Sequence, residues 1–124
     1  MKTLPAAQLE IMLVIWENGE SLSRKQIQEL LTAKNWQTAT INTLLHRLVE
    51  SGFLKYTHKG REYIYYAAIS KNEYQAEMSH DIVNTLYNNS LSNFVVTFVN
   101  SGNLSNDDID ELQNLLNDLK NRED

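Results

Sequence analysis

Apolar residues recur at helical spacing in the middle of the chain. Between residues 38 and 51 they are Ile41, Leu44, Leu45, Leu48 and Val49. The steps i, i+3, i+4, i+7 and i+8 place them on one side of an α-helix. Gly52 then suits the left-handed residue that commonly ends a helix. The pattern therefore predicts a helix over residues 38–51 with one buried side.

The opposite side of this helix is polar and slim. Most of its side chains are short or form hydrogen bonds, which suits the DNA major groove, where a single helix can read the base edges. We therefore predict that this side contacts DNA. The predicted contacts are Thr38, Ala39, Thr40, Asn42, Thr43, His46 and Arg47.

Two short runs rich in aromatic and β-branched residues follow, at residues 53–57 and 61–67. Because His58, Lys59 and Gly60 join them, they predict a β-hairpin with a basic tip. A hairpin directly after a groove helix is typical of a winged helix, whose wing lies on neighbouring phosphates. The predicted wing contacts are Lys55, His58, Lys59 and Arg61.

Two further helices are predicted before the groove helix, which completes a helix-turn-helix. The first spans about residues 5–19, with an inward stripe of Leu9, Met12, Leu13 and Trp16. The second begins at Ser23, which forms an S-x-x-Q capping box with Gln26. Its inward stripe is Ile27, Leu30 and Leu31.

The remainder of the chain carries three amphipathic segments. Capping boxes at Ser70 with Glu73 and at Ser105 with Asp108 open the first and the last, and residues 91–99 form the second. This stretch is too short to bury such wide apolar stripes by itself, so we predict a two-fold dimer. The predicted interface residues are Tyr74, Met78, Ile82, Leu86, Leu91, Phe94, Val95, Phe98, Val99, Ile109, Leu112, Leu115, Leu116 and Leu119.

These elements predict a mostly α fold with a small β-hairpin wing. Residues 1–68 would form a winged helix-turn-helix that binds DNA, and residues 69–124 a helical dimerisation domain. At 124 residues with 42% hydrophobic content, the chain can bury one moderate core and a small accessory domain, but no large enzyme fold.

The net charge of −5 is unevenly distributed. Residues 24–62 hold seven lysines and arginines against three glutamates, while the acidic side chains gather in the tail. Since salt screens charges over about 8 Å at physiological ionic strength, a distant acidic tail does not cancel a local basic face. The basic segment is the one that the helical pattern assigns to DNA.

The sequence shows no motif for catalysis or for binding a metal or a cofactor. The chain has no cysteine, its three histidines show no metal-ligand spacing, and no catalytic triad, paired-carboxylate motif or phosphate-binding glycine loop is present. We therefore expect no enzyme activity, no cofactor and no metal site. Without a long apolar run or a leader-like start, we expect a cytoplasmic protein that does not insert into a membrane.

The core W-x-x-x-T-I-x-T-L-L-x-R-L, at Trp36–Leu48, resembles the penicillinase-repressor family, the BlaI, MecI and CopY group of winged-helix repressors. LPAAQLEIMLVIWENG, GREYIYYAAIS and FVNSGNLSNDDIDELQNLL extend the resemblance along nearly the whole chain. It implies a homodimeric repressor that binds a palindrome with TACA and TGTA half-sites until a signal releases it. The matching residues are Thr40, Thr43, Arg47, Gly60 and Arg61.

The chain also departs from that family. Ala39 and Asn42 stand where antibiotic-responsive members often carry basic residues, so the resemblance does not fix the base readout. Those members are cleaved at an Asn-Phe bond in the tail, through a membrane sensor or protease system. Here Thr97-Phe98 stands at the corresponding place, and the Asn93-Phe94 pair offers the Asn-Phe dipeptide in a different register. Copper-responsive members end in paired cysteines, which this chain lacks, so sensing of copper or zinc by thiolates is excluded.

Two other functions fit the same pattern. A winged helix can serve as a protein-interaction module, which would show no salt-dependent affinity for DNA. A small-molecule-sensing regulator would hold a pocket between the winged domain and the tail, and its ligand would raise the melting temperature.

Overall fold

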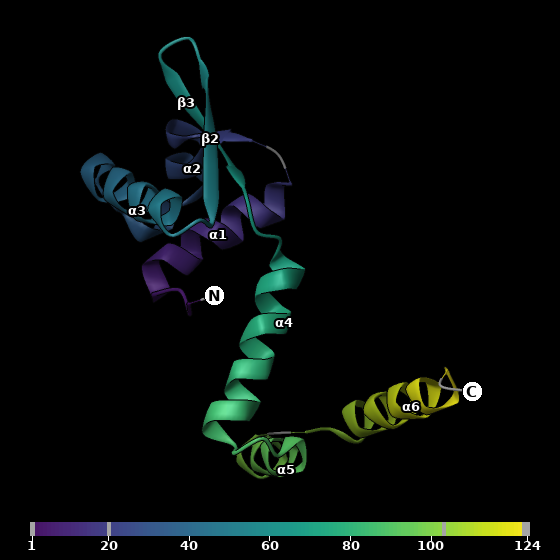
Figure 1. The fold of residues 1–124 in the computed structure, drawn as a ribbon. Helices are drawn as coiled ribbons and strands as arrows, with labels where there is room; N and C mark the ends of the chain where they lie inside the picture. Colours follow the sequence, from purple (N-terminus) through teal and green to yellow (C-terminus); the bar gives the residue numbers. More distant parts are fainter. Residues whose placement is uncertain (1, 20, 103, 123–124) are drawn as a thin grey trace. The chain divides into compact units, whose positions relative to one another are not determined.

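The structure, a computed structural model, describes residues 2–19, 21–102 and 104–122. It is mostly α-helical with one small antiparallel sheet (Figure 1), as the sequence pattern predicted. In chain order the elements are α1 (Ala6–Asn18), β1 (Leu22–Ser23), α2 (Arg24–Leu30), the 3-10 turn η1 (Thr32–Lys34), α3 (Thr38–Glu50), β2 (Leu54–Lys59), β3 (Glu62–Ala67), α4 (Lys71–Asp81), the π-helical turn η2 (Ile82–Leu86), α5 (Leu91–Ser101) and α6 (Asn106–Arg122). The chain divides into two compact units, Met1–His80 and Asp81–Asp124.

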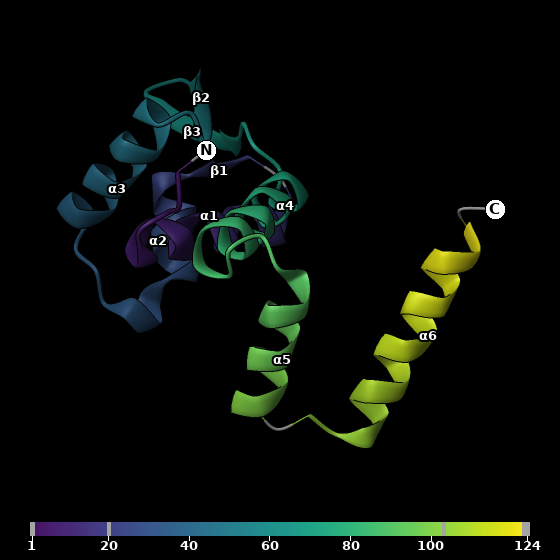
Figure 2. The same cartoon turned by 60° about the horizontal axis from the view of Figure 1, so that its bottom comes forward.

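The predicted helix-turn-helix lies in the first unit. Ser23 Oγ accepts a hydrogen bond from the Gln26 backbone N–H at 3.2 Å, and Gln26 Oε1 accepts one from the Ser23 N–H at 2.9 Å. The predicted capping box is therefore confirmed, and it starts α2. Figure 2 shows the loop between α2 and α3, where Asn35 adopts a left-handed φ of 55° after η1. This turn redirects the chain into α3.

The sheet has the strand order β1-β3-β2, and β2 and β3 form the projecting hairpin in Figure 1. Lys59 pairs with Glu62, so the loop is Gly60-Arg61. Strand β2 runs two residues further toward the tip than its predicted run, and β3 starts one residue later than predicted. Gly60 has a φ of 65°, which glycine tolerates at the first position of a two-residue hairpin loop. The sequence pattern missed β1, because two residues carry no alternation and the strand exists only through its pairing with β3.

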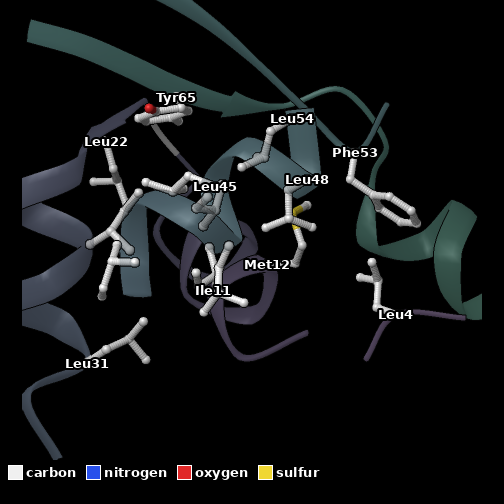
Figure 3. Packing of buried hydrophobic residues seen from close by; sticks show 14 of the residues in the cluster. Leu4, Ile11, Met12, Leu22, Leu31, Leu45, Leu48, Phe53, Leu54 and Tyr65 are labelled. Carbon is white, nitrogen blue, oxygen red and sulfur yellow. The ribbon is translucent and has the colours of Figure 1, made fainter. Parts of the chain in front are cut away.

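The core of the first unit gathers around α3. Figure 3 shows Ile11 and Met12 from α1 beside Leu45 and Leu48 from α3, with the sheet residues Leu54 and Tyr65 above them. The predicted inner stripe of α3 is confirmed, and only Val49 at its end is partly rather than fully buried. Burial of this stripe fixes which side of α3 faces solvent.

The predicted stripes of α1 and α2 were partly wrong. The buried apolar residues of α1 are Ile11, Met12 and Ile15, whereas Leu13 is 37% exposed. Because α1 is apolar on nearly every side, its spacing alone does not identify the inner face. In α2, Ile27 is buried and Leu31 follows it into the core, but Leu30 is 50% exposed.

The start of α4 packs against the winged unit through Tyr74. Its hydroxyl accepts a hydrogen bond from the Leu4 backbone N–H at 2.9 Å, and its ring centroid lies 5.7 Å from those of Trp16 and Phe53. Met78, one turn later, is partly buried against the same core. The first compact unit therefore continues past residue 68 to His80. Tyr74, a predicted interface residue, is buried within its own chain and is not exposed for contact with a second subunit.

Tyr74→Phe is expected to destabilise the protein by about 1 kcal/mol, because it removes the acceptor of a buried hydrogen bond and keeps the ring. Thermal unfolding followed by circular dichroism measures this. Tyr56→Phe is the matched control, since the Tyr56 side chain is 44% exposed and should change the unfolding free energy little. Equal stabilities of the two variants would contradict the role given to the Tyr74 hydroxyl.

The second unit consists of η2, α5 and α6. The amphipathic segment predicted to open at Ser70 continues from α4 through η2, and Asn88 and Asn89 then end it with φ angles of 52° and 65°. Ser90, a cap that the sequence pattern missed, accepts from the Asn93 N–H at 3.1 Å, and the predicted Ser105 capping box at α6 is confirmed. Within the described helices α5 and α6, no side chain is buried.

Candidate nucleic-acid interface

The outer face of α3 is fully open to solvent. Its inner stripe is buried, and every residue that the sequence pattern assigned to DNA contact from this helix is exposed. The helix is thirteen residues long and ends at Glu50, followed by the cap residue Ser51 and by Gly52 with a φ of 86°. The exposed and predicted contacts are Thr38, Ala39, Thr40, Asn42, Thr43, His46 and Arg47.

Several polar groups on this face already have partners within the chain. Thr43 Oγ1 donates to the Ala39 carbonyl at 3.0 Å, which leaves the hydroxyl oxygen free to accept. His46 Nε2 lies 3.0 Å from Glu50 Oε1, so one turn of the helix carries both a basic and an acidic group. The Arg47 side chain makes no hydrogen bond or ion pair among the described residues, so its guanidinium is available to an external acceptor.

The four predicted wing contacts are exposed, but they do not share one face of the hairpin. Side chains alternate along a strand, so His58 and Tyr56 lie on one face of β2, and Lys55 and Lys59 on the other. The His58 ring lies 4.5 Å from the Tyr63 ring, within an aromatic cluster. Lys55 and Lys59 therefore form a separate basic edge, and Arg61 sits in the turn between the strands.

The aromatic face of the hairpin is turned toward α3. A hollow of about 560 Å³ separates them, lined by Asn42, His46 and Val49 of α3 and by Tyr56, Tyr63 and Tyr65 of the hairpin. The Tyr56 and Tyr63 rings lie 4.8 Å apart and are each nearly half exposed. Such rings present flat apolar surface beside the polar face of α3.

Burial of the Tyr65 phenol raises its pKa above the ordinary value of 10.0, and Tyr63 and Tyr56 add to the effect, while Arg24 opposes it. Burial disfavours the charged phenolate, so the hydroxyl stays neutral and can donate a hydrogen bond at physiological pH. Arg24 and Tyr65 line the same hollow, so that cation lies beside the wing.

Two cations that the sequence analysis did not assign to the site lie beside it. Arg24 and Lys25 of α2 line a second hollow, of about 210 Å³, together with Asn42 of α3 and Arg61 of the wing. Their place at the start of a capped helix gave no local sign of a site. The excess of basic residues within 24–62 was the one signal that included them.

The second unit exposes a continuous series of large apolar side chains on α5 and α6. Phe98 is 60% exposed and Leu116 64%, and all other predicted interface residues of these helices are exposed except Phe94, which is half-buried. A hollow of about 430 Å³ between the helices is lined by Phe98, Leu104, Leu112 and Leu115, among others. Contiguous exposed apolar surface is typical of sites that bind another protein, so the predicted interface residues stay available to a partner.

Ile82 and Leu86, the predicted interface residues of η2, are exposed too. The suggested cleavage region belongs to α5. Thr97 and Phe98, the cleavage region suggested by the resemblance, are both exposed and lie inside the helix rather than in a loop. Across residues 2–19, 21–102 and 104–122, histidine and carboxylate side chains nowhere gather in groups of three or more that would suit a metal ion. In the same part of the chain, the helices are all too short or too polar to span a lipid bilayer.

Known transcriptional regulators resemble this chain over most of its length. The chain is similar to the penicillinase repressor of Bacillus licheniformis, with 35% identity over 98% of both chains. It is 30% identical to the methicillin resistance regulatory protein MecI of Staphylococcus aureus, over 92% of this chain and 93% of that one.

A mutant MarR from E. coli has a similar structure, with a TM-score of 0.50 and 18% identity over 94% of this chain and 77% of that chain. This likeness concerns the fold, which is a winged helix with additional helices. The family model described as penicillinase repressor matches residues 4–118, which include both units almost completely. The chain therefore belongs to the penicillinase repressor family.

Proposed function

We propose that this protein is a homodimeric transcriptional repressor that binds a palindromic DNA operator and is released by a signal. The observation that carries the proposal is the exposed polar face of α3, which stands beside a basic hairpin and is fixed in orientation by its buried inner stripe. A helix with such a face can enter the major groove, while the hairpin contacts phosphates outside it. Relatives whose names describe repressors support the same assignment.

The proposed dimer forms through α5 and α6. Their apolar side chains are exposed in the single chain, and a second copy would cover them with an identical set. Two linked heads then bind two half-sites arranged as an inverted repeat, since operator symmetry follows protein symmetry. The interface that we propose starts beyond Tyr74, which already packs inside its own chain.

The proposed release signal would reach the repressor through a membrane sensor or protease system acting on α5. Thr97 and Phe98 are exposed there, but they lie in a helix, which would have to unfold locally before a protease could cut it.

Fluorescence anisotropy with duplexes carrying inverted TACA and TGTA half-sites tests the proposed function. We expect tight binding to this duplex, weaker binding to a scrambled one, and an affinity that falls as the salt concentration rises. A chain without salt-dependent affinity for any duplex would instead be a protein-interaction module. If small molecules raised the melting temperature and released DNA, the protein would be a ligand-sensing regulator.

Neutralising the wing in Lys59→Gln with Arg61→Gln should weaken binding to operator and scrambled duplexes alike. Both side chains are exposed at the hairpin tip, and each lost phosphate contact should reduce the slope of log K against log salt by roughly 0.9. Lys120→Gln, which removes a cation from α6, is the control and should keep the parental slope. A double variant with the parental slope would show that the wing tip points away from the duplex.

A further inference from the structure

The hollow of about 210 Å³ beside α3 is lined by three cationic side chains, more than any other part of the proposed DNA-binding face. Arg24 and Lys25 of α2 and Arg61 of the hairpin loop all line it, against one carboxylate, Glu62. Two segments that are far apart in the sequence, the start of α2 and the hairpin loop, therefore bring cations to one place. Asn42 lines the same hollow and also belongs to the exposed face of α3, so the basic hollow and the groove face are continuous.

Arg24 is held in place relative to the beginning of α3. Its Nη1 donates to Gln28 Oε1, which also accepts a hydrogen bond from Thr38 Oγ1 at 3.2 Å. The amide nitrogen of Gln28 donates to the Trp36 carbonyl at 3.4 Å. Gln28 thus ties the guanidinium to the residues where the groove helix starts.

We propose that this hollow binds one backbone phosphate of the same DNA duplex whose major groove receives α3; this rests on the proposed function. Arg24 and Arg61 can each direct two N–H donors at phosphate oxygens, and Lys25 adds a point charge. The hollow is small, at about 210 Å³, and opens beside the groove face, which suits a single phosphate on a continuous strand. Binding there sets the register of α3 along the groove without reading sequence.

The adjoining tyrosines suit the rest of that strand. Tyr63 and Tyr65 line both the basic hollow and the larger hollow between the hairpin and α3. The half-exposed Tyr63 ring offers an apolar surface to a deoxyribose next to the bound phosphate. A DNA strand that crosses this face would therefore contact first the cations and then the neighbouring aromatic surface, a combination that other nucleic-acid grooves also use.

Arg24→Gln and Lys25→Gln test the site, with Lys71→Gln as the charge-matched control, since Lys71 lies on α4 and lines a different surface. Each site variant should weaken operator and scrambled duplexes alike by roughly tenfold and lower the salt slope by roughly 0.9. Lys71→Gln should match the parent. Melting curves confirm that each variant is folded, and because both site residues are tested, one unstable variant does not decide the outcome.

A scan of duplexes with single methylphosphonate linkages then identifies the phosphate. At one position per half-site, the neutral linkage should remove the difference between the parent and Arg24→Gln, because the contact has already been lost. At every other position the difference should persist. If the difference persists at all positions, Arg24 touches no phosphate, and the proposal is overturned.

The same experiments separate this inference from the proposed function. A parent chain that binds no duplex in a salt-dependent way overturns both. A parent that binds DNA, with Arg24→Gln and Lys25→Gln at the parental slope, overturns the phosphate site alone. If inorganic phosphate at constant ionic strength stabilises the parent but not Arg24→Gln against thermal unfolding, while Arg24→Gln keeps the parental DNA affinity and salt slope, the hollow is a site for a small anion, and the DNA assignment fails.

Discussion

Phe98→Asp is expected to turn the protein into monomers and to weaken binding to a two-half-site operator by roughly 10² to 10⁴ fold. A dimer holds its second head near the second half-site at high effective concentration, and a monomer loses this gain. Sedimentation analysis at micromolar concentration measures the oligomeric state, and anisotropy measures the affinity. Affinity for a single half-site should stay unchanged, because the first unit does not contain residue 98.

The position of Phe98 explains the size of this effect. Its ring is 60% exposed in the single chain, lies 6.4 Å from the Phe94 ring and lines the hollow between α5 and α6. Burying one large apolar side chain contributes about 1.5 to 3 kcal/mol, and two-fold symmetry counts it twice. An aspartate would place an unpaired charge in the interface from both subunits, and burying such a charge is strongly unfavourable.

Asn93→Asp is the matched control. It introduces the same charge into α5, but at 100° per residue it points away from the apolar stripe. This variant should remain dimeric with parental operator affinity. Two results would refute the model: a parent that sediments as a monomer, or a Phe98→Asp variant that remains a dimer, which would place the interface elsewhere.

Local signals in the sequence were enough to predict the elements that form the proposed DNA-binding face. The spacing of apolar residues identified α3 and its exposed side, and serine caps located the starts of α2 and α6. These signals act over three or four residues, within the reach of one helical turn. Their geometry is therefore set by neighbours along the chain.

Features that depend on distant partners were missed. Tyr74 shares its helical spacing with Met78 and Ile82, yet its surroundings are set by Leu4 and Phe53, far away in the sequence. Arg24 looked like an ordinary first residue of a helix until the hairpin brought Arg61 beside it. The spacing of residues along one helix predicts which side chains share a face, but it does not predict which distant residues that face contacts.

Arg47→Ala is expected to weaken operator binding by about 1 to 3 kcal/mol, the range for an arginine that contacts a base or clamps a phosphate well. Arg47 is exposed on the outer face of α3, and it packs into neither the core nor an ion pair among the described residues. Thermal stability should therefore stay close to the parental value. Anisotropy titration with the operator duplex and thermal unfolding measure the two effects.

A scrambled duplex and the Arg47→Lys variant distinguish the two possible roles of this side chain. If Arg47 reads a base, Arg47→Ala should lose more affinity for the operator than for scrambled DNA, and lysine should not restore the difference, because it lacks the guanidinium's bidentate fork. If Arg47 clamps a phosphate, both duplexes should lose equally and lysine should restore much of the affinity. A folded Arg47→Ala variant with parental affinity for both duplexes would show that the outer face of α3 does not face the DNA at this turn of the helix.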